Sequence, residues 1–165
     1  MRRVCWSGWV SAALLVVFVL VVSACTPSEP LVPEDIQQTV NADDRERNYD
    51  LAWQEIRAMV GDIERGDLDS LTEDSLVIVS RMERLETGEA SGMSDRQTAS
   101  QVAEWEQDIM TKTVDERIRR LGELAGLLPQ LFDPGEFAEA RAVSLEIYVI
   151  TRSLGDRTGS TGGSK

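Results

Sequence analysis

Apolar residues spaced three and four positions apart fill the middle of this chain, and this spacing limits the fold more than any other feature. It is the spacing of one face of an α-helix. A first helix is predicted from about residue 43 to 65, with the stripe Tyr49, Ala52, Ile56, Met59 and Ile63. A second is predicted between an N-cap at Thr72 and a C-cap at Gly88, with the stripe Leu71, Ser75, Ile78, Met82 and Leu85.

Two capping signals mark the third helical stretch. Ser94 with Gln97, and Thr113 with Glu116, have the spacing of a capping box. The helix that begins near Ser94 is therefore predicted either to break or to kink at Thr113, and Pro129 limits how far it continues. Its core-facing residues are predicted to be Thr98, Val102, Trp105, Ile109, Val114, Ile118, Leu121 and Leu124.

The last stretch carries two conflicting signals. The sequence Asp-Pro-Gly-Glu at 133–136 has a cap and a proline at the first helical position, and predicts a helix from Pro134 to about Leu154 that ends at Gly155. A strand-like alternation runs through the same region, at Val143, Leu145, Ile147 and Val149. Helix is favoured because isolated strands form a weak sheet and a buried helix is equally apolar. The prediction is an all-α fold, an antiparallel bundle of about four helices within residues 34–155.

The first 25 residues have the order of an export signal. Arg2 and Arg3 precede an apolar run at 9–22, and small residues follow. The run ends in Val22-Ser23-Ala24-Cys25, which resembles the lipobox of bacterial lipoproteins, an aliphatic residue and two small residues before an invariant cysteine. The resemblance implies that residues 1–24 are a signal peptide that is removed, and that Cys25 carries a diacylglyceryl group.

Two other interpretations of this segment are an uncleaved membrane anchor and an ordinary signal peptide with a chance cysteine. The apolar run is shorter than the roughly 20 residues that a membrane-spanning helix needs, which favours a signal core. The resemblance places the protein on the extracytoplasmic face of the cell membrane or of an outer membrane. Acyl chains such as palmitate on Cys25 are then its membrane anchor.

The segments that flank the helical region have little capacity to pack. Residues 25–33 contain three prolines and are predicted to form an extended tether after the lipidated cysteine. Residues 156–165 are rich in Gly, Ser and Thr and are predicted to be a disordered tail. Cys5 lies in the signal peptide, so the mature chain keeps one cysteine and forms no internal disulfide.

Charge and missing residue types exclude several functions. The chain has 17 basic and 29 acidic residues and no histidine, a net charge of -12. The absence of histidine removes imidazole bases and histidine metal ligands. The acidic balance argues against nucleic acid and against electrostatic docking on anionic lipid, so the lipid at Cys25 has to provide the membrane attachment. Since no catalytic motif is present either, we predict a protein that is not an enzyme and has no cofactor.

Acidic clusters are predicted to have structural roles. Asp67 and Asp69 superficially resemble a calcium loop, but the later ligand positions do not match, and a charged turn with helix capping is favoured. A weak surface calcium site is the alternative. Glu104 and Asp108 are predicted to share a solvated helix face from which Glu106 points away, and none of the three is predicted to be catalytic. No catalytic, cofactor-binding or metal-binding residue is assigned.

One basic cluster and one tryptophan leave alternatives open. The cluster comprises Lys112, Arg117, Arg119 and Arg120, and acid-before-base spacing predicts the surface pairs Asp115–Arg119 and Glu116–Arg120. The alternative is a site for an anion or an acidic partner. Trp53 is predicted to pack in the core, with an exposed anchor for a partner as the alternative.

The function expected from these observations is that of a lipid-anchored envelope protein. The lipobox-like segment and the lack of site chemistry favour an interaction or scaffolding module with a protein partner at the envelope. The alternative is a cation- or small-ligand-binding lipoprotein, suggested by a mature chain with 15 basic and 29 acidic residues, a net charge of -14.

Overall fold

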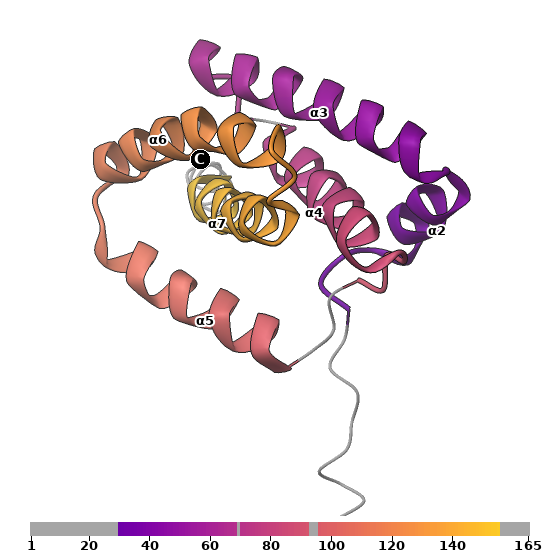
Figure 1. Cartoon of the computed structure of the whole chain (residues 1–165). Helices are drawn as coiled ribbons and strands as arrows, with labels where there is room; N and C mark the ends of the chain where they lie inside the picture. The colour runs from indigo at the N-terminus through magenta and orange to yellow at the C-terminus, as the bar shows by residue number, and fades with distance from the viewer. Residues whose placement is uncertain (1–29, 69, 93–95, 156–165) are drawn as a thin grey trace, which may run out of the picture.

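The computed structural model of the protein describes residues 30–68, 70–92 and 96–155, and within these ranges it contains helices and no strand (Figure 1). The helices are α2 (Glu34–Ala42), α3 (Arg45–Arg65), α4 (Leu71–Thr87), α5 (Arg96–Thr111), α6 (Val114–Phe132) and α7 (Phe137–Gly155). The all-α prediction is confirmed. The described residues form six helices where about four were expected.

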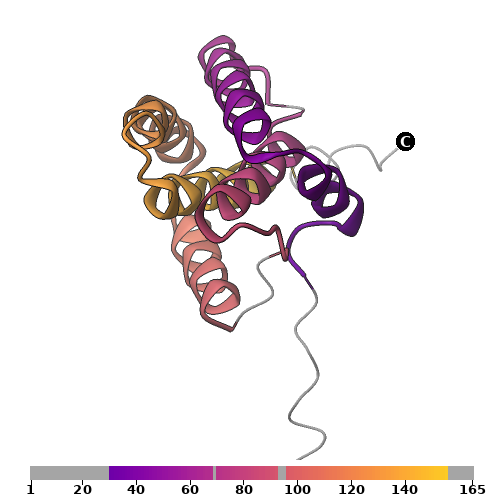
Figure 2. The same ribbon diagram turned by 45° about the vertical axis from the view of Figure 1, so that its right-hand side comes forward.

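The last helix, α7, lies at the centre of the fold and packs against α4, α5 and α6 (Figures 1 and 2). Helix α3 crosses α4 and α6 on one side, and α2 packs on α4. Contacts between α4 and α7 join Thr72 to Thr151 and Met82 to Ser144, so the two helices are antiparallel. Figure 1 also shows that α5 covers the other side of α7.

The central position of α7 explains its strand-like sequence. Most of its length is buried on every side, at Ala140, Val143, Ser144, Leu145, Ile147, Tyr148, Val149, Ile150 and Thr151. Because no face turns fully to solvent, the usual helical stripe is lost. The buried hydroxyls are satisfied within the helix, since Ser144 donates to the Ala140 carbonyl at 3.0 Å and Thr151 to the Ile147 carbonyl at 3.1 Å.

The first two predicted helices are found, with one corrected start. Asp44 caps α3, its carboxylate accepting from the Arg47 amide at 2.8 Å. Helix α4 begins at Leu71, so Thr72 is not its N-cap; the Thr72 hydroxyl instead lies 3.4 Å from that of Thr151. Gly88 is the C-cap as predicted, with φ at 91°.

The third predicted helix is two helices, α5 and α6, separated at Thr113. The Thr113–Glu116 capping box is present with both of its hydrogen bonds. Pro129 does not limit α6, which continues to Phe132. The proline removes one backbone hydrogen bond, and the helix continues for only three residues after it. The capping signal at Ser94 lies outside the described residues.

The start of the last helix was predicted wrongly. Helix α7 begins at Phe137, and residues 133–136 instead terminate α6. The Glu136 amide donates to the Leu131 carbonyl and the Gly135 amide to that of Phe132, both at 3.0 Å. With Gly135 at a φ of 87°, this is the Schellman end of a helix. The glycine therefore determines the local structure, because it fits the left-handed position that such an end requires.

The folded unit begins earlier than residue 34, and the prediction that residues 30–33 belong to a free tether is wrong. Val32 is fully buried in the core. The Leu31 amide donates to the Gly92 carbonyl at 3.0 Å, and the buried Glu83 carboxylate accepts from the amide of Gly92 at 3.3 Å. Helix α2, which the sequence analysis missed, follows Pro33 directly. The chain is therefore fixed to the fold from about Leu31 onward.

A buried polar network joins α4 to α3 and to the α2–α3 turn. Arg81 on α4 is buried, and its Nε donates to both oxygens of Glu55, at 3.0 and 2.9 Å. Its Nη1 donates to Asp43 at 3.0 Å and to the Asn48 side-chain oxygen at 2.8 Å. Burial raises the pKa of the Glu55 carboxyl above its ordinary value of 4.5, although Arg81 acts in the opposite direction.

The raised pKa of Glu55 predicts a pH dependence of stability. In the unfolded chain Glu55 ionises near its ordinary pKa, whereas in the folded protein it ionises at higher pH. The contribution of this pKa difference to the free energy of unfolding is therefore fully present below about pH 4.5 and is lost as the pH rises through the folded pKa. We expect the free energy of unfolding of the wild type, measured relative to Glu55→Gln by urea titration, to fall as the pH rises above about 4.5. The exposed Glu64→Gln on the same helix is the control, and an identical fall against Glu64→Gln would contradict the prediction.

Candidate functional site between α5, α6 and α7

The basic cluster of the sequence is divided by the fold. Arg119 is exposed and pairs with Glu123, and Arg120 bonds to Glu146 on α7, so the predicted pairs with Asp115 and Glu116 are wrong. Glu116 instead accepts from the Thr113 amide at 2.8 Å, and this hydrogen bond lowers the pKa of its carboxyl.

Arg117 is the unexpected member of the cluster, because it is only 1% exposed. Helix α6 presents Arg117, Leu121, Leu124 and Leu128 to the core, and leaves Val114 and Ile118 exposed at 38% and 49%. The prediction that Val114 and Ile118 face the core is therefore wrong. The sequence signal for the buried face of α6 was the spacing i, i+4, i+7, i+11 of Arg117 and the three leucines that follow it.

A cavity of about 350 Å³ lies where α5, α6 and α7 meet. It is lined by Trp105, Asp108, Ile109, Lys112, Arg117, Arg120, Glu146 and Ile150. Three of these residues are cationic and two are acidic. The cavity therefore has a positively charged lining in a chain whose net charge is -12.

Two of the three cations in the lining are already paired. Arg120 binds Glu146 with two hydrogen bonds, at 2.8 and 3.0 Å, and these bonds raise the pKa of the Arg120 guanidinium, which stays charged. Lys112 pairs with Asp108 one turn earlier on the exposed edge of α5. Neither pair involves the third cation.

Arg117 is held by uncharged groups alone. Its Nε donates to the Lys112 carbonyl at 3.2 Å, and its Nη1 donates to the carbonyl and hydroxyl oxygens of Ser153 at 3.4 and 3.3 Å. Its Nη2 is buried and has no hydrogen-bond partner among the described residues. No ion pair of Arg117 with a carboxylate is present in this part of the chain.

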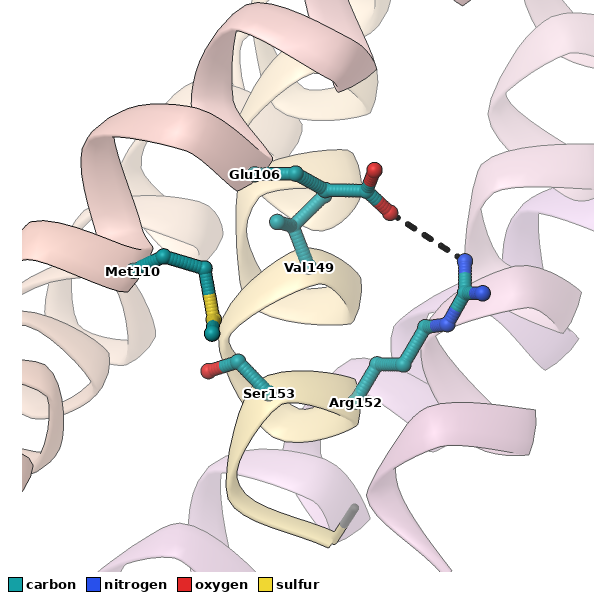
Figure 3. A pocket seen from close by; sticks show the side chains of 5 residues that line it. All are labelled: Glu106, Met110, Val149, Arg152 and Ser153. Carbon is teal, nitrogen blue, oxygen red and sulfur yellow. Dashed lines mark hydrogen bonds and ion pairs between the residues drawn. The ribbon is translucent and has the colours of Figure 1, made fainter.

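A smaller cavity of about 220 Å³ lies between α5 and α7. Figure 3 shows its lining, with Glu106 and Met110 from α5 and Val149, Arg152 and Ser153 from α7. Glu106 and Arg152 form an ion pair at 3.2 Å across it. Met110 is 63% exposed at the outer end of α5.

The exposed large apolar residues of the described ranges are all on α5 and α6, at Met110, Val114, Ile118 and Leu127. Three of them, Met110, Val114 and Ile118, lie within nine residues on either side of the α5–α6 turn. We call these three residues the apolar corner. Leu127 lies further along α6 and is not part of it.

The other candidate residues of the sequence do not join this region. Asp67 is exposed in the turn after α3, and Asp69 lies outside the described residues. Glu104 is exposed on α5, whereas Glu106 lines the smaller cavity and Asp108 the larger one. No group of three acidic or cysteine side chains in the described ranges is placed to hold a metal ion.

Trp53 packs against the core, as predicted. Its ring is stacked on that of Phe132, with centroids 5.5 Å apart, and the Arg57 guanidinium covers it at 4.7 Å. Half-buried and covered in this way, Trp53 is not a free anchor for a partner.

Comparison with known protein families, with characterised proteins and with solved structures finds no match for this chain. Among the described helices, none has the length and apolarity that crossing a membrane requires. Cys25 lies outside the described residues.

Proposed function

We propose that this chain is a lipid-anchored extracytoplasmic protein whose helical domain docks a protein partner of the cell envelope through the apolar corner. The lipobox-like segment at Cys25 supports the anchor. The observation that carries the docking surface is the gathering of Met110, Val114 and Ile118, all exposed, at one turn of the fold.

The position of the corner argues for a protein partner and against the lipid surface. Pro30 is the fifth residue after Cys25, and five residue steps span at most about 17 Å even when fully extended. Leu31 is bonded to Gly92, and α5 begins four residues after Gly92. Helix α5 then runs about 24 Å to the corner. Figure 1 shows this turn at the end of α5 that joins α6, away from α2. We infer that the anchor holds the corner away from the membrane.

Site-specific photo-crosslinking in intact cells tests the proposal. A crosslinking residue at Ile118, and separately at Met110, is expected to give one and the same protein adduct. The same residue at Leu127, equally apolar and on the same helix, is the matched control and is expected to give none. Ile118→Asp should weaken docking about 30-fold or more if Ile118 is an interface hot spot, and should abolish the Met110 adduct.

The mass of the adduct distinguishes the occupants. An adduct of twice the mass of the chain would assign the corner to self-association, and a lipid adduct would place it at the membrane; both results contradict the proposal. So would equal adducts at Ile118 and Leu127, because the contact would then have no relation to the corner.

The alternative function is that of a cation- or small-ligand-binding lipoprotein, and the cavity beside Arg117 is the candidate binding site for it. The unpaired charge of its lining is positive, which suits an anion and not a cation. This feature is independent of the apolar corner.

A further inference from the structure

Arg117 is a buried cation whose own contacts leave it incomplete. The three acceptors that it reaches are uncharged and lie 3.2 to 3.4 Å away, and its Nη2 has no acceptor among the described residues. Burying an ionised group is costly unless an opposite charge compensates it. Arginine does not lose its proton to escape this cost. The position therefore calls for a negatively charged group.

The charges around the cavity fix the charge of that group. Glu146 neutralises the charge of Arg120, and Asp108 neutralises that of Lys112. The positive charge of Arg117 is therefore the one in the lining that has no carboxylate partner among the described residues. A single negative charge balances it. A doubly charged anion such as phosphate would bring an excess charge close to the carboxylates of Glu146 and Asp108.

The remaining lining describes the rest of the ligand. Trp105, Ile109 and Ile150 give the cavity apolar walls from both α5 and α7. Its volume of about 350 Å³ equals roughly twelve waters at about 30 Å³ each, much more than a bare carboxylate fills. A short aliphatic chain or a single ring fits both the walls and the volume.

We propose that Arg117 binds the carboxylate of a small organic monocarboxylic acid, whose apolar body occupies the cavity between α5, α6 and α7. The carboxylate supplies the acceptor that Nη2 lacks, and planar guanidinium and carboxylate groups match in geometry. Because Nη2 is sealed from solvent, entry needs a side-chain movement. Among the charged residues of the lining Asp108 has the most exposed side chain, at 62%, so we expect it to be the one that moves.

Thermal unfolding of the full chain, purified in a non-ionic detergent, tests the proposal with hexanoate as the probe. At constant pH and ionic strength, saturating hexanoate is expected to raise the unfolding midpoint by about 3 °C or more. Hexanamide, which has the same chain without the charge, and inorganic phosphate are expected to give no such rise.

Two arginines on the same helix provide a matched pair of variants. Arg117→Gln is expected to abolish the hexanoate shift. Arg119→Gln removes an equal charge two residues away, from a side chain that is exposed and outside the cavity, and is expected to keep the full shift. An equal shift in both variants, an equal shift with hexanamide, or a larger shift with phosphate would each overturn the proposal.

The chain itself contains a competing carboxylate. Asp156 follows Ser153 by three residues in sequence and lies outside the described part. If hexanoate shifts the midpoint of Asp156→Asn but not that of the wild type, Arg117 is compensated from within the chain and the proposal fails. It also fails if neither protein responds.

A second measurement covers the case in which Arg117→Gln does not fold. In the wild-type protein, nuclear Overhauser contacts are expected between the methylene protons of hexanoate and the indole ring of Trp105. Their absence at saturating hexanoate would overturn the proposal without any variant.

Discussion

Replacement of Arg81 by alanine is expected to lower the free energy of unfolding by about 3–5 kcal/mol, the range for breaking a buried ion pair from one side. The guanidinium is the common donor of a network that includes Glu55 and Asn48 from α3 and Asp43 from the α2–α3 turn. Its removal leaves the Glu55 carboxylate without its cation and the buried Asn48 amide oxygen without a donor, while Asp43 keeps only its ion pair with Arg47. Each of these losses acts on the contact that holds α3 to α4.

Urea titration at pH 7 measures this loss, and two variants make the result specific. Arg119→Ala removes an exposed arginine whose one ion pair within the described residues is with Glu123 on its own helix, and should cost less than about 0.5 kcal/mol. The double variant Arg81→Ala with Glu55→Gln should cost clearly less than the sum of the two single losses, because the residues are direct partners. A loss below about 1 kcal/mol for Arg81→Ala would show that the network does not hold these helices.

The parts of the fold that the sequence predicts well are those where periodicity and capping agree. The stripe from Tyr49 to Ile63 is found in α3, and Gly88 ends α4 as expected. Thr113 and Glu116 form their capping box, because this signal depends on four neighbouring residues and not on tertiary contacts.

The errors arise where one local signal serves two elements. Asp-Pro-Gly-Glu at 133–136 has the residues of a helix start, but Gly135 also satisfies the left-handed position at a helix end, and the structure uses it for that purpose. Such a choice depends on how the two helices meet. Similarly, α2 lacks a side-chain cap, and its buried apolar residue is Val40, so its signal in sequence is weak.

The candidate site shows a different reason why the sequence alone does not predict the structure. The row of Val114 and Ile118 and the row that begins with Arg117 both continue into Leu121, and polarity alone favours the apolar row. The structure buries the arginine and exposes the two apolar residues. A preference of this kind, against the hydrophobic pattern, is common at functional sites, and both proposals for this protein depend on it.

Replacement of Cys25 by alanine is expected to have the largest effect on the protein in the cell, because it removes the proposed membrane anchor. None of the described helices is suited to cross a bilayer, and the acidic chain has no electrostatic attraction to anionic lipid. Acyl chains contribute about 0.8 kcal/mol for each buried methylene, and two or more chains anchor a protein stably where one does not. The processed wild-type protein should therefore partition into the detergent phase of a cloud-point separation.

Metabolic labelling with an alkyne fatty acid measures the anchor directly. The wild type is expected to incorporate the label and Cys25→Ala to incorporate none, with the variant moving from the detergent phase to the soluble fraction. Cys5→Ala is the matched control, because the only other cysteine of the chain lies in the predicted signal peptide and should be irrelevant to labelling. Label retained by Cys25→Ala would contradict the lipobox interpretation. It would also remove the argument that the short link between Cys25 and Pro30 directs the apolar corner away from the membrane.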